Sequence, residues 1–198
     1  NPVNNIDVNG DSVWYTRNGD IVTMHVTAKI FNNSSDNINM ARAAKDIVSD
    51  IKSTYEGKFE WSDNKTYNLK VDMDLKVATS MKDVENSDHL FVLADSDSKG
   101  ARGATSMLGG KVMTLASSDF ANNNWLSNNL SYNKTFTAAH EFGHAIGLSH
   151  SQNPFNIMKQ GGVVHNSNSN QRVIMLQQQN NLNNNLVVDI YNLGLKWR

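Results

Sequence analysis

Hydrophobic and polar residues alternate along several stretches of the first half of the chain. Apolar side chains occupy every second position from Val22 to Ala28, which predicts a half-buried strand over 21–30. The pair Asn18-Gly19 separates this strand from the apolar segment 13–16, so a β-hairpin is expected there. The same alternation predicts another strand over 69–77.

From Asp36 the hydrophobic period becomes that of a helix, with Ser35 or Asp36 as the expected N-cap. The apolar positions at helical spacing are Ala41, Ala44, Ile47, Val48, Ile51 and Tyr55. A second helix is predicted from about Thr135 to Ile146, and a third from about Asn170 to Asn181, before a short segment over 186–195.

Between the first two helices the pattern predicts three short strands. The apolar run His89 to Ala94 is expected to be central in its sheet, since both of its faces are apolar. Gly103 to Leu108 and Lys111 to Ala116 are expected to form two more strands, joined at Gly109-Gly110. This element order predicts an α+β or α/β protein built on one mixed sheet.

Composition excludes several classes of protein and of site. The 198 residues carry 18 basic and 19 acidic side chains, without the basic surface typical of nucleic-acid binders. The longest apolar runs are too short to span a bilayer, so no membrane span is expected. There are no cysteines, which excludes disulfides, thiolate zinc sites and cysteine nucleophiles. The chain begins at Asn1 without an initiator Met or a signal pattern, so we expect a removed pro-segment or targeting segment.

The stretch "HEFGHAIGLSH", residues 140–150, carries the chemistry. His140 and His144 lie one helical turn apart, so both imidazoles can bind one metal ion. Glu141 is rotated by about 100° from His140, which places its carboxylate beside the ion, where a general base is needed. Gly147 ends the helix and lets the chain turn back, so that His150 reaches the same ion. Zinc is the natural ion for three neutral imidazoles with an open fourth position.

The rest of the sequence identifies the third ligand. Zinc peptidases with a glutamate as third ligand need an acid downstream of the second histidine. No Glu follows Glu141, and Asp189 is the only acid in the remainder of the chain. His150 is therefore the expected third ligand.

These residues match the HExxHxxGxxH signature, and Met158 follows it at the place of a methionine turn. In this the chain resembles the metzincin zinc metallopeptidases. Ser151 and the short connection through Pro154 to Met158 resemble the matrixins in particular. The sequence departs from that of animal matrixins, because His89 is the only histidine in 88–117. A second, structural zinc site is therefore not supported. The chain therefore resembles a divergent, bacterial, matrixin-like member.

The resemblance implies a single catalytic domain over 1–198, with an upper lobe (1–147) and a small lower lobe (148–198). The upper lobe would hold a five-stranded twisted mixed sheet and two helices, and the lower lobe one C-terminal helix. Zinc would lie in the cleft between them, with Met158 as a hydrophobic floor. The family further implies a monomer that is secreted, periplasmic or exposed at the cell surface.

The resemblance also implies where an extended protein or peptide substrate binds. It would pair with the edge strand, formed by Gly103, Ala104, Thr105, Ser106, Met107 and Leu108. The wall of the pocket for the residue after the scissile bond would include Gly161, Gly162, Val163 and Val164. No acid lies between Phe142 and Val188, so apolar or uncharged residues are expected in this pocket.

Calcium is a second candidate cofactor, because 95–100 resembles the start of a calcium loop. Lys99 stands at the fifth position and Ser106 at the twelfth, so the segment is not an EF-hand. A polar turn after a strand is the alternative.

The function predicted from the sequence is a zinc-dependent endopeptidase in which Glu141 activates water. A non-catalytic zinc-containing binding protein or inhibitor with the same fold is the alternative, and zinc hydrolysis of a non-peptide substrate is a third hypothesis.

Overall fold

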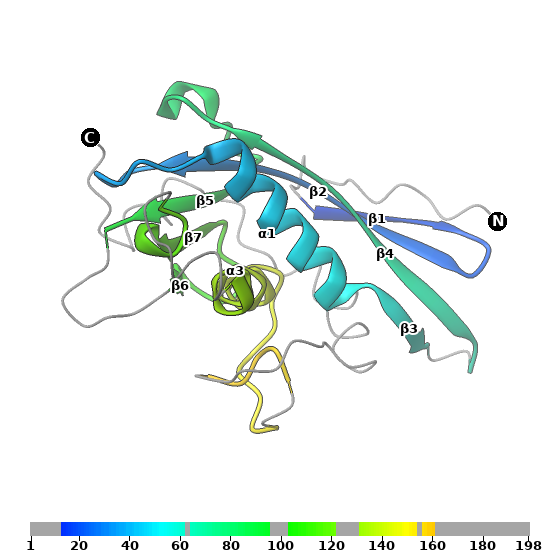
Figure 1. Cartoon of the computed structure of the whole chain (residues 1–198). Helices are drawn as coiled ribbons and strands as arrows, with labels where there is room; N and C mark the ends of the chain where they lie inside the picture. Colours follow the sequence, from blue (N-terminus) through cyan, green and yellow to red (C-terminus); the bar gives the residue numbers. More distant parts are fainter. Residues whose placement is uncertain (1–12, 62–63, 96–102, 122–130, 154–155, 161–198) are drawn as a thin grey trace.

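The computed structural model describes residues 13–61, 64–95, 103–121, 131–153 and 156–160 (Figure 1). Within these ranges the chain forms one mixed sheet with two α-helices, which confirms the predicted mixed α and β class. The strands are β1 (Val13–Asn18), β2 (Ile21–Asn32), β3 (Gly57–Glu60), β4 (Thr66–Val77), β5 (His89–Ala94), β6 (Gly103–Thr105) and β7 (Val112–Ala116). The helices are α1 (Met40–Tyr55) and α3 (Ser131–Ala145), with 3-10 turns η1 (Met81–Asp83) and η2 (Ser117–Asp119). The predicted segments 170–181 and 186–195 lie outside the described residues.

The sheet has the strand order β3-β4-β2-β5-β7-β6. Strands β4, β2, β5 and β7 are parallel, and β3 and β6 lie antiparallel at the two edges. Strand β1 pairs antiparallel with the first half of β2, while β5 pairs with its second half. As predicted, β5 is central and β6 is an edge strand of the sheet.

The expected count of five strands is wrong, because the described residues form seven. Strand β2 is 12 residues long, so β5 covers only part of one of its edges and β1 pairs along the rest. Strand β3 adds an antiparallel partner to the first part of β4. The hairpin itself is confirmed, but Asn18 pairs with Ile21, so the turn residues are Gly19 and Asp20. Gly19 has a φ of 61°, which a glycine adopts without strain.

Helix α1 begins four residues later than predicted, because the preceding segment is bonded elsewhere. The hydroxyl of Ser117 donates to Asp36 at 2.6 Å, and Ile38 forms an isolated β-bridge with Ala121. Asn39 is the N-cap, and its side chain accepts a hydrogen bond from the Arg42 amide at 3.0 Å. The predicted caps Ser35 and Asp36 are therefore wrong.

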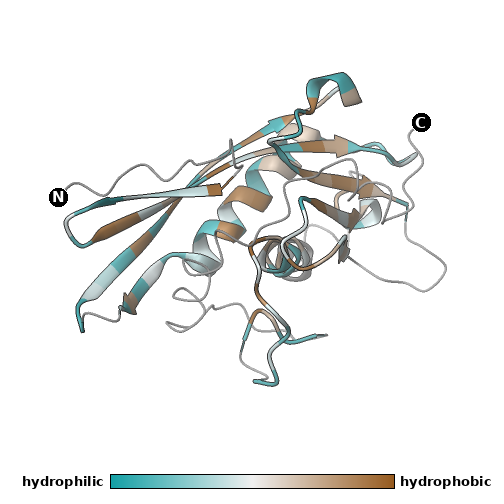
Figure 2. Ribbon diagram, turned by 180° about the vertical axis from the view of Figure 1, so that it is seen from behind, coloured by the Kyte–Doolittle hydropathy of each residue, from teal (hydrophilic) through white to brown (hydrophobic). Residues whose placement is uncertain are grey.

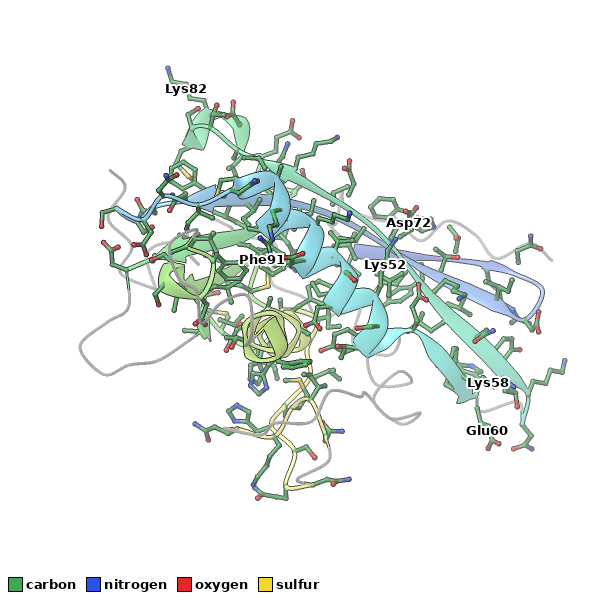
Figure 3. All side chains as sticks on the ribbon, viewed as in Figure 1. Lys52, Lys58, Glu60, Asp72, Lys82 and Phe91 are labelled. Carbon is green, nitrogen blue, oxygen red and sulfur yellow. The ribbon has the colours of Figure 1, made fainter. Side chains whose placement is uncertain are left out.

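Both α-helices pack on one face of the sheet, where the main core lies. Figure 2 shows hydrophobic and hydrophilic segments alternating along the long strands, as half-buried strands require. In Figure 3, Phe91 of β5 lies among the side chains between sheet and helices, whereas Lys58, Glu60 and Lys82 lie at the periphery. A smaller cluster on the other face contains Leu90, and it packs against Met81 of η1.

His89 is buried under α3, where its ring lies edge-on to that of Phe142 at 6.2 Å. It is thus a core residue of β5, as expected of an ordinary strand histidine. Burial lowers the pKa of His89 to about 3, with a further lowering from Lys111 and an opposing hydrogen bond to the Ala145 backbone. In the described part of the chain, no helix is long and apolar enough to cross a bilayer.

The Asn39 cap can be tested with Asn39→Ala, which should lower the free energy of unfolding by about 1 kcal/mol, since an N-cap bond is lost. Urea denaturation measures the change. Asn37→Ala is the matched control, because Asn37 is exposed and precedes the helix. Equal losses in both variants would contradict the assignment of Asn39 as the cap.

Buried His89 should make the zinc-free protein sensitive to acid. Below about pH 6.5 the unfolded chain protonates this histidine, whereas the folded chain does so only near pH 3. Stability is therefore lost as the pH falls through this window, by about 1.4 kcal/mol per pH unit from His89 alone. His89→Asn should remove that part of the slope in urea denaturation performed at a series of pH values. Parallel wild-type and variant slopes would show that His89 is not the group responsible.

Candidate metal centre

Helix α3 ends in a backbone arrangement that determines where the third histidine lies. Gly147 has a φ of 91°, in the left-handed region that favours glycine. The Leu148 amide donates to the Gly143 carbonyl at 2.8 Å and the Gly147 amide donates to the His144 carbonyl at 3.0 Å. These two bonds define a Schellman motif, which reverses the chain just after the helix. The predicted role of Gly147 as the helix terminator is confirmed.

The three predicted histidines converge. Their ligand atoms lie within 4.8 Å of one another, and theirs is the one such group of His, Asp or Glu side chains within the described ranges. Nε2 of His144 lies 3.1 Å from Nε2 of His140 and 3.1 Å from Nε2 of His150. A tetrahedral zinc ion bound at about 2.0–2.1 Å separates its nitrogen ligands by about 3.3 Å, so this spacing fits zinc.

Backbone carbonyls orient two of the rings. Nδ1 of His140 lies 2.7 Å from the Ile157 carbonyl, and Nδ1 of His144 lies 2.7 Å from the Leu148 carbonyl. Because a carbonyl can only accept, each Nδ1 carries the hydrogen and each neutral ring keeps a lone pair on Nε2.

The Nε2 lone pairs of His140 and His144 face each other, an arrangement that a bound cation would stabilise. Two neutral Nε2 atoms at 3.1 Å cannot hydrogen-bond to each other, since neither carries a hydrogen. Protonation is disfavoured, because burial lowers the pKa of His140. Burial also lowers the pKa of His144, to about 4. The two neighbouring histidines lower it further, while the hydrogen bond to the Leu148 carbonyl opposes the shift. A metal ion accepts both lone pairs, and three imidazoles are a donor set suited to zinc.

Glu141 lies beside this cluster on the same helix and is only 7% exposed. Its Oε2 accepts a hydrogen bond from the Thr105 hydroxyl at 2.7 Å. The pKa of Glu141 is raised, chiefly because burial disfavours the charged form, while Thr105 and His150 act in the opposite direction. A buried carboxylate with a raised pKa is suited to accepting a proton near neutral pH.

Met158 is fully buried beneath α3, in the turn that follows the histidines. Its amide donates to the side-chain oxygen of Asn156 at 2.8 Å, and its carbonyl accepts from the Ser151 amide at 2.9 Å. The sulfur lies against Gly143, where a Cβ would come within 3.1 Å of Met158 Cε and 2.5 Å of the Tyr55 hydroxyl. Gly143 thus allows the turn to approach the helix.

Tyr55, at the end of α1, connects the two helices. Its hydroxyl donates to the Ala139 carbonyl at 2.7 Å and lies 4.0 Å from Met158 Sδ. Burial, with smaller effects of Asp50 and Glu141, raises the pKa of Tyr55, so its hydroxyl keeps its proton.

The predicted edge strand lies next to the metal centre. Strand β6 spans only 103–105, and Met107 and Leu108 are exposed by 39% and 51% in the turn that follows. The amide of Gly109, in the same turn, donates to the His144 carbonyl at 2.8 Å. The predicted pocket wall, Gly161 to Val164, lies outside the described residues, and so does the calcium-like loop except for Asp95.

Several features of the site have no signal in the sequence. The carbonyls of Leu148 and Ile157 orient the imidazoles, yet every residue carries a carbonyl. Tyr55 was expected only as an apolar helix position. The hydrogen bond between Thr105 and Glu141 joins a strand to a helix, and the two residues are 36 positions apart in the sequence.

Three converging histidines beside a buried carboxylate define a zinc hydrolase type of site. Comparison with known protein families identifies the family. The matrixin sequence profile matches residues 14–181. This match covers most of the chain, which therefore belongs to the matrixin family of zinc metallopeptidases. No curated protein sequence matches the chain significantly.

Among solved structures, the chain resembles metalloproteinase-II from Bacteroides fragilis at 16% identity and a TM-score of 0.43, covering 76% of this chain and 52% of that one. It also resembles archaemetzincin from Methanopyrus kandleri at 12% identity and a TM-score of 0.48, covering 78% and 96%. Archaemetzincin from Archaeoglobus fulgidus matches at 16% identity and a TM-score of 0.37, covering 74% and 91%. The chain thus spans about half the length of the Bacteroides protein.

The close approach at Gly143 predicts that Gly143→Ala destabilises the protein. A Cβ there overlaps Met158 and the Tyr55 hydroxyl, and overpacking of this kind destabilises a fold by about 1–3 kcal/mol. This loss exceeds the stability gained from the higher helix propensity of alanine. Urea denaturation of the zinc-free protein measures the loss. In a Met158→Ala background the same substitution should cost less, because the obstructing sulfur is gone. An equal cost in both backgrounds would show that Met158 is not the obstruction.

Proposed function

We propose that this chain is a zinc-dependent endopeptidase that hydrolyses peptide bonds in proteins, with Glu141 as the general base. The observation that carries the proposal is the buried Glu141 carboxylate on the helix that also presents two of the three converging imidazoles. A zinc site that served structure alone would not need a desolvated carboxylate at this place. This favours an enzyme over a non-catalytic binding protein or inhibitor with the same fold.

Each residue of the site has a distinct part in this proposal. His140, His144 and His150 hold the ion, and the carbonyls of Ile157 and Leu148 keep Nε2 of the first two rings free for it. Bound zinc supplies Lewis acidity, which makes water acidic near neutral pH and polarises a carbonyl oxygen. Met158 supports the histidines from below as an apolar floor.

Glu141 performs the proton transfers. It takes a proton from the attacking water and passes it to the nitrogen of the departing amine. Its Oε2 is held by Thr105, while Oε1 has no hydrogen-bond donor among the protein groups in the described ranges. Oε1 is therefore the oxygen that takes the proton.

An extended substrate segment is the occupant that fits the edge of the sheet. Strand β6 has β7 on one side and no strand on the other within the described residues, so its outer backbone groups suit strand addition. This favours peptide segments over small non-peptide substrates. We assign residues 103–108 to this contact and residues 161–164 to the pocket wall, with apolar or uncharged side chains preferred there.

The wider setting follows the family. Matrixins are typically extracellular, and we propose a secreted, periplasmic or cell-surface enzyme of bacterial type. We further propose that 1–198 is one catalytic domain with lobes 1–147 and 148–198, zinc in the cleft between them and a monomeric state. Zinc is the cofactor that the family and the three histidines imply, and calcium stays a candidate at 95–100.

Glu141→Ala should keep zinc bound but lower cleavage of a peptide library by at least about 100-fold, because general base catalysis is lost. Zinc content is measured by atomic absorption and cleavage by mass spectrometry of the products, which also defines the preferred side chains. The wild-type enzyme treated with a chelator and then restored with zinc is the control. Full activity in the variant would exclude Glu141 as the base, and an inactive, zinc-loaded wild type would favour the binding-protein alternative.

A further inference from the structure

Thr105 lies where the edge strand meets the general base. Its hydroxyl is 2.7 Å from Glu141 Oε2 and 3.0 Å from the Glu141 carbonyl oxygen, so both acceptors belong to one residue. The shorter distance, to the carboxylate, is typical of a charge-assisted hydrogen bond. Within the described ranges, no other protein group donates to this carboxylate in a hydrogen bond.

Strand β6 also lies directly against the Glu141 side chain at Gly103, two residues before Thr105. A Cβ on Gly103 would lie 2.9 Å from Glu141 Cγ and 3.0 Å from Oε1, and closer still to Thr137 Cγ2. Only glycine leaves room for the carboxylate at this point. Gly103 and Thr105 therefore fix the Glu141 side chain together, one by shape and the other by a hydrogen bond.

The pairing of β6 with β7 shows which backbone groups of Thr105 face outward. The Ser106 amide donates to the Val112 carbonyl at 3.2 Å, so Ser106 and Val112 are a hydrogen-bonded pair. Directly opposed residues alternate between bonded and non-bonded pairs, so Thr105 and its partner Met113 are a non-bonded pair. The amide and carbonyl of Thr105 consequently point to the free edge, where a substrate strand would add.

We infer that Thr105 is a positioning residue that couples substrate pairing at the edge strand to the orientation of Glu141. Its backbone faces the site of strand addition, and its hydroxyl holds Oε2 so that Oε1 stays directed at the attacking water. The inference rests on the proposed endopeptidase function and adds a residue that acts through the general base. It assigns the hydroxyl to positioning and the backbone to substrate binding.

The chain offers a matched set of variants. Thr105→Val keeps the shape of the side chain and the backbone but removes the hydroxyl, whereas Thr105→Ser keeps the hydroxyl. Thr114→Val makes the same chemical change on β7, where the Thr114 hydroxyl has no hydrogen-bond partner in the described part of the protein. All are compared in the full chain with a peptide taken from the cleavage library.

Thr105→Val should lower kcat by about 10- to 100-fold, the range found when a supporting hydrogen bond next to a metal centre is lost. KM should stay within about threefold of the wild-type value, because the backbone that pairs with substrate is unchanged. Zinc content should not change. Thr105→Ser should recover most of kcat, and Thr114→Val should match the wild type.

A second readout needs no zinc and no turnover. The chain has four glutamates (Glu56, Glu60, Glu85 and Glu141), so labelling their side-chain carboxyl carbons with 13C gives a simple spectrum. The Glu141 resonance is assigned with Glu141→Gln. In the zinc-free protein it should move in Thr105→Val, and it should stay near its wild-type position in Thr105→Ser and Thr114→Val.

The outcomes separate this inference from the proposed function. A wild-type kcat in Thr105→Val, an unmoved Glu141 resonance, or a serine variant as impaired as the valine variant would each overturn the role of the hydroxyl. If the wild-type chain cleaved no peptide, the proposed function would fail on its own. The resonance would then decide the contact between Thr105 and Glu141, and an unmoved signal would overturn it.

Discussion

Two imidazole nitrogens that face each other without a hydrogen between them are the constraint on which the rest of the site depends. The carbonyls of Ile157 and Leu148 take the Nδ1 hydrogens of His140 and His144, which leaves two Nε2 lone pairs 3.1 Å apart. Burial makes protonation an expensive way to relieve this arrangement, since it lowers the pKa of both rings. A metal ion relieves it directly, so the arrangement of the imidazoles is that of a metal-binding site.

This arrangement depends in turn on the end of α3. The Schellman motif at Gly147 places the Leu148 carbonyl against His144, four residues earlier, and sends the chain back toward the same point. The turn that contains Met158 then packs beneath Gly143, and the neighbouring Ile157 carbonyl reaches His140. A short segment after the helix therefore supplies the third histidine of the cluster and both backbone acceptors. Metal affinity should be sensitive to changes in this segment that touch no ligand.

Much of this could be predicted from the sequence, because the motif is local and periodic. The helical spacing of His140 and His144, the break at Gly147 and the alternation in β2 and β4 depend on residues close together in the chain. The start of α1 could not be predicted, since contacts with Ser117 and Ala121 hold residues 36–38 out of the helix. Strand β3 was missed because it has four residues and only Phe59 is buried. The hydrogen bond between Thr105 and Glu141 depends on tertiary packing, which the periodicity of the sequence does not predict.

The hairpin of β6 and β7 is hydrogen-bonded to helix α3 at two points. The Thr105 hydroxyl bonds to Glu141, and the Gly109 amide bonds to the carbonyl of His144. These two acceptors lie one turn apart on α3, so the hairpin follows the part of the helix that carries Glu141 and His144. A substrate strand added to β6 would be held by the same hairpin that is bonded to Glu141 and to the His144 backbone. Its scissile bond would therefore keep a defined distance from them, which matters because hydrolysis requires the water, the base and the carbonyl to be aligned. A small non-peptide substrate would not pair with this edge, so the connection between hairpin and helix supports the proposed action on extended peptide segments.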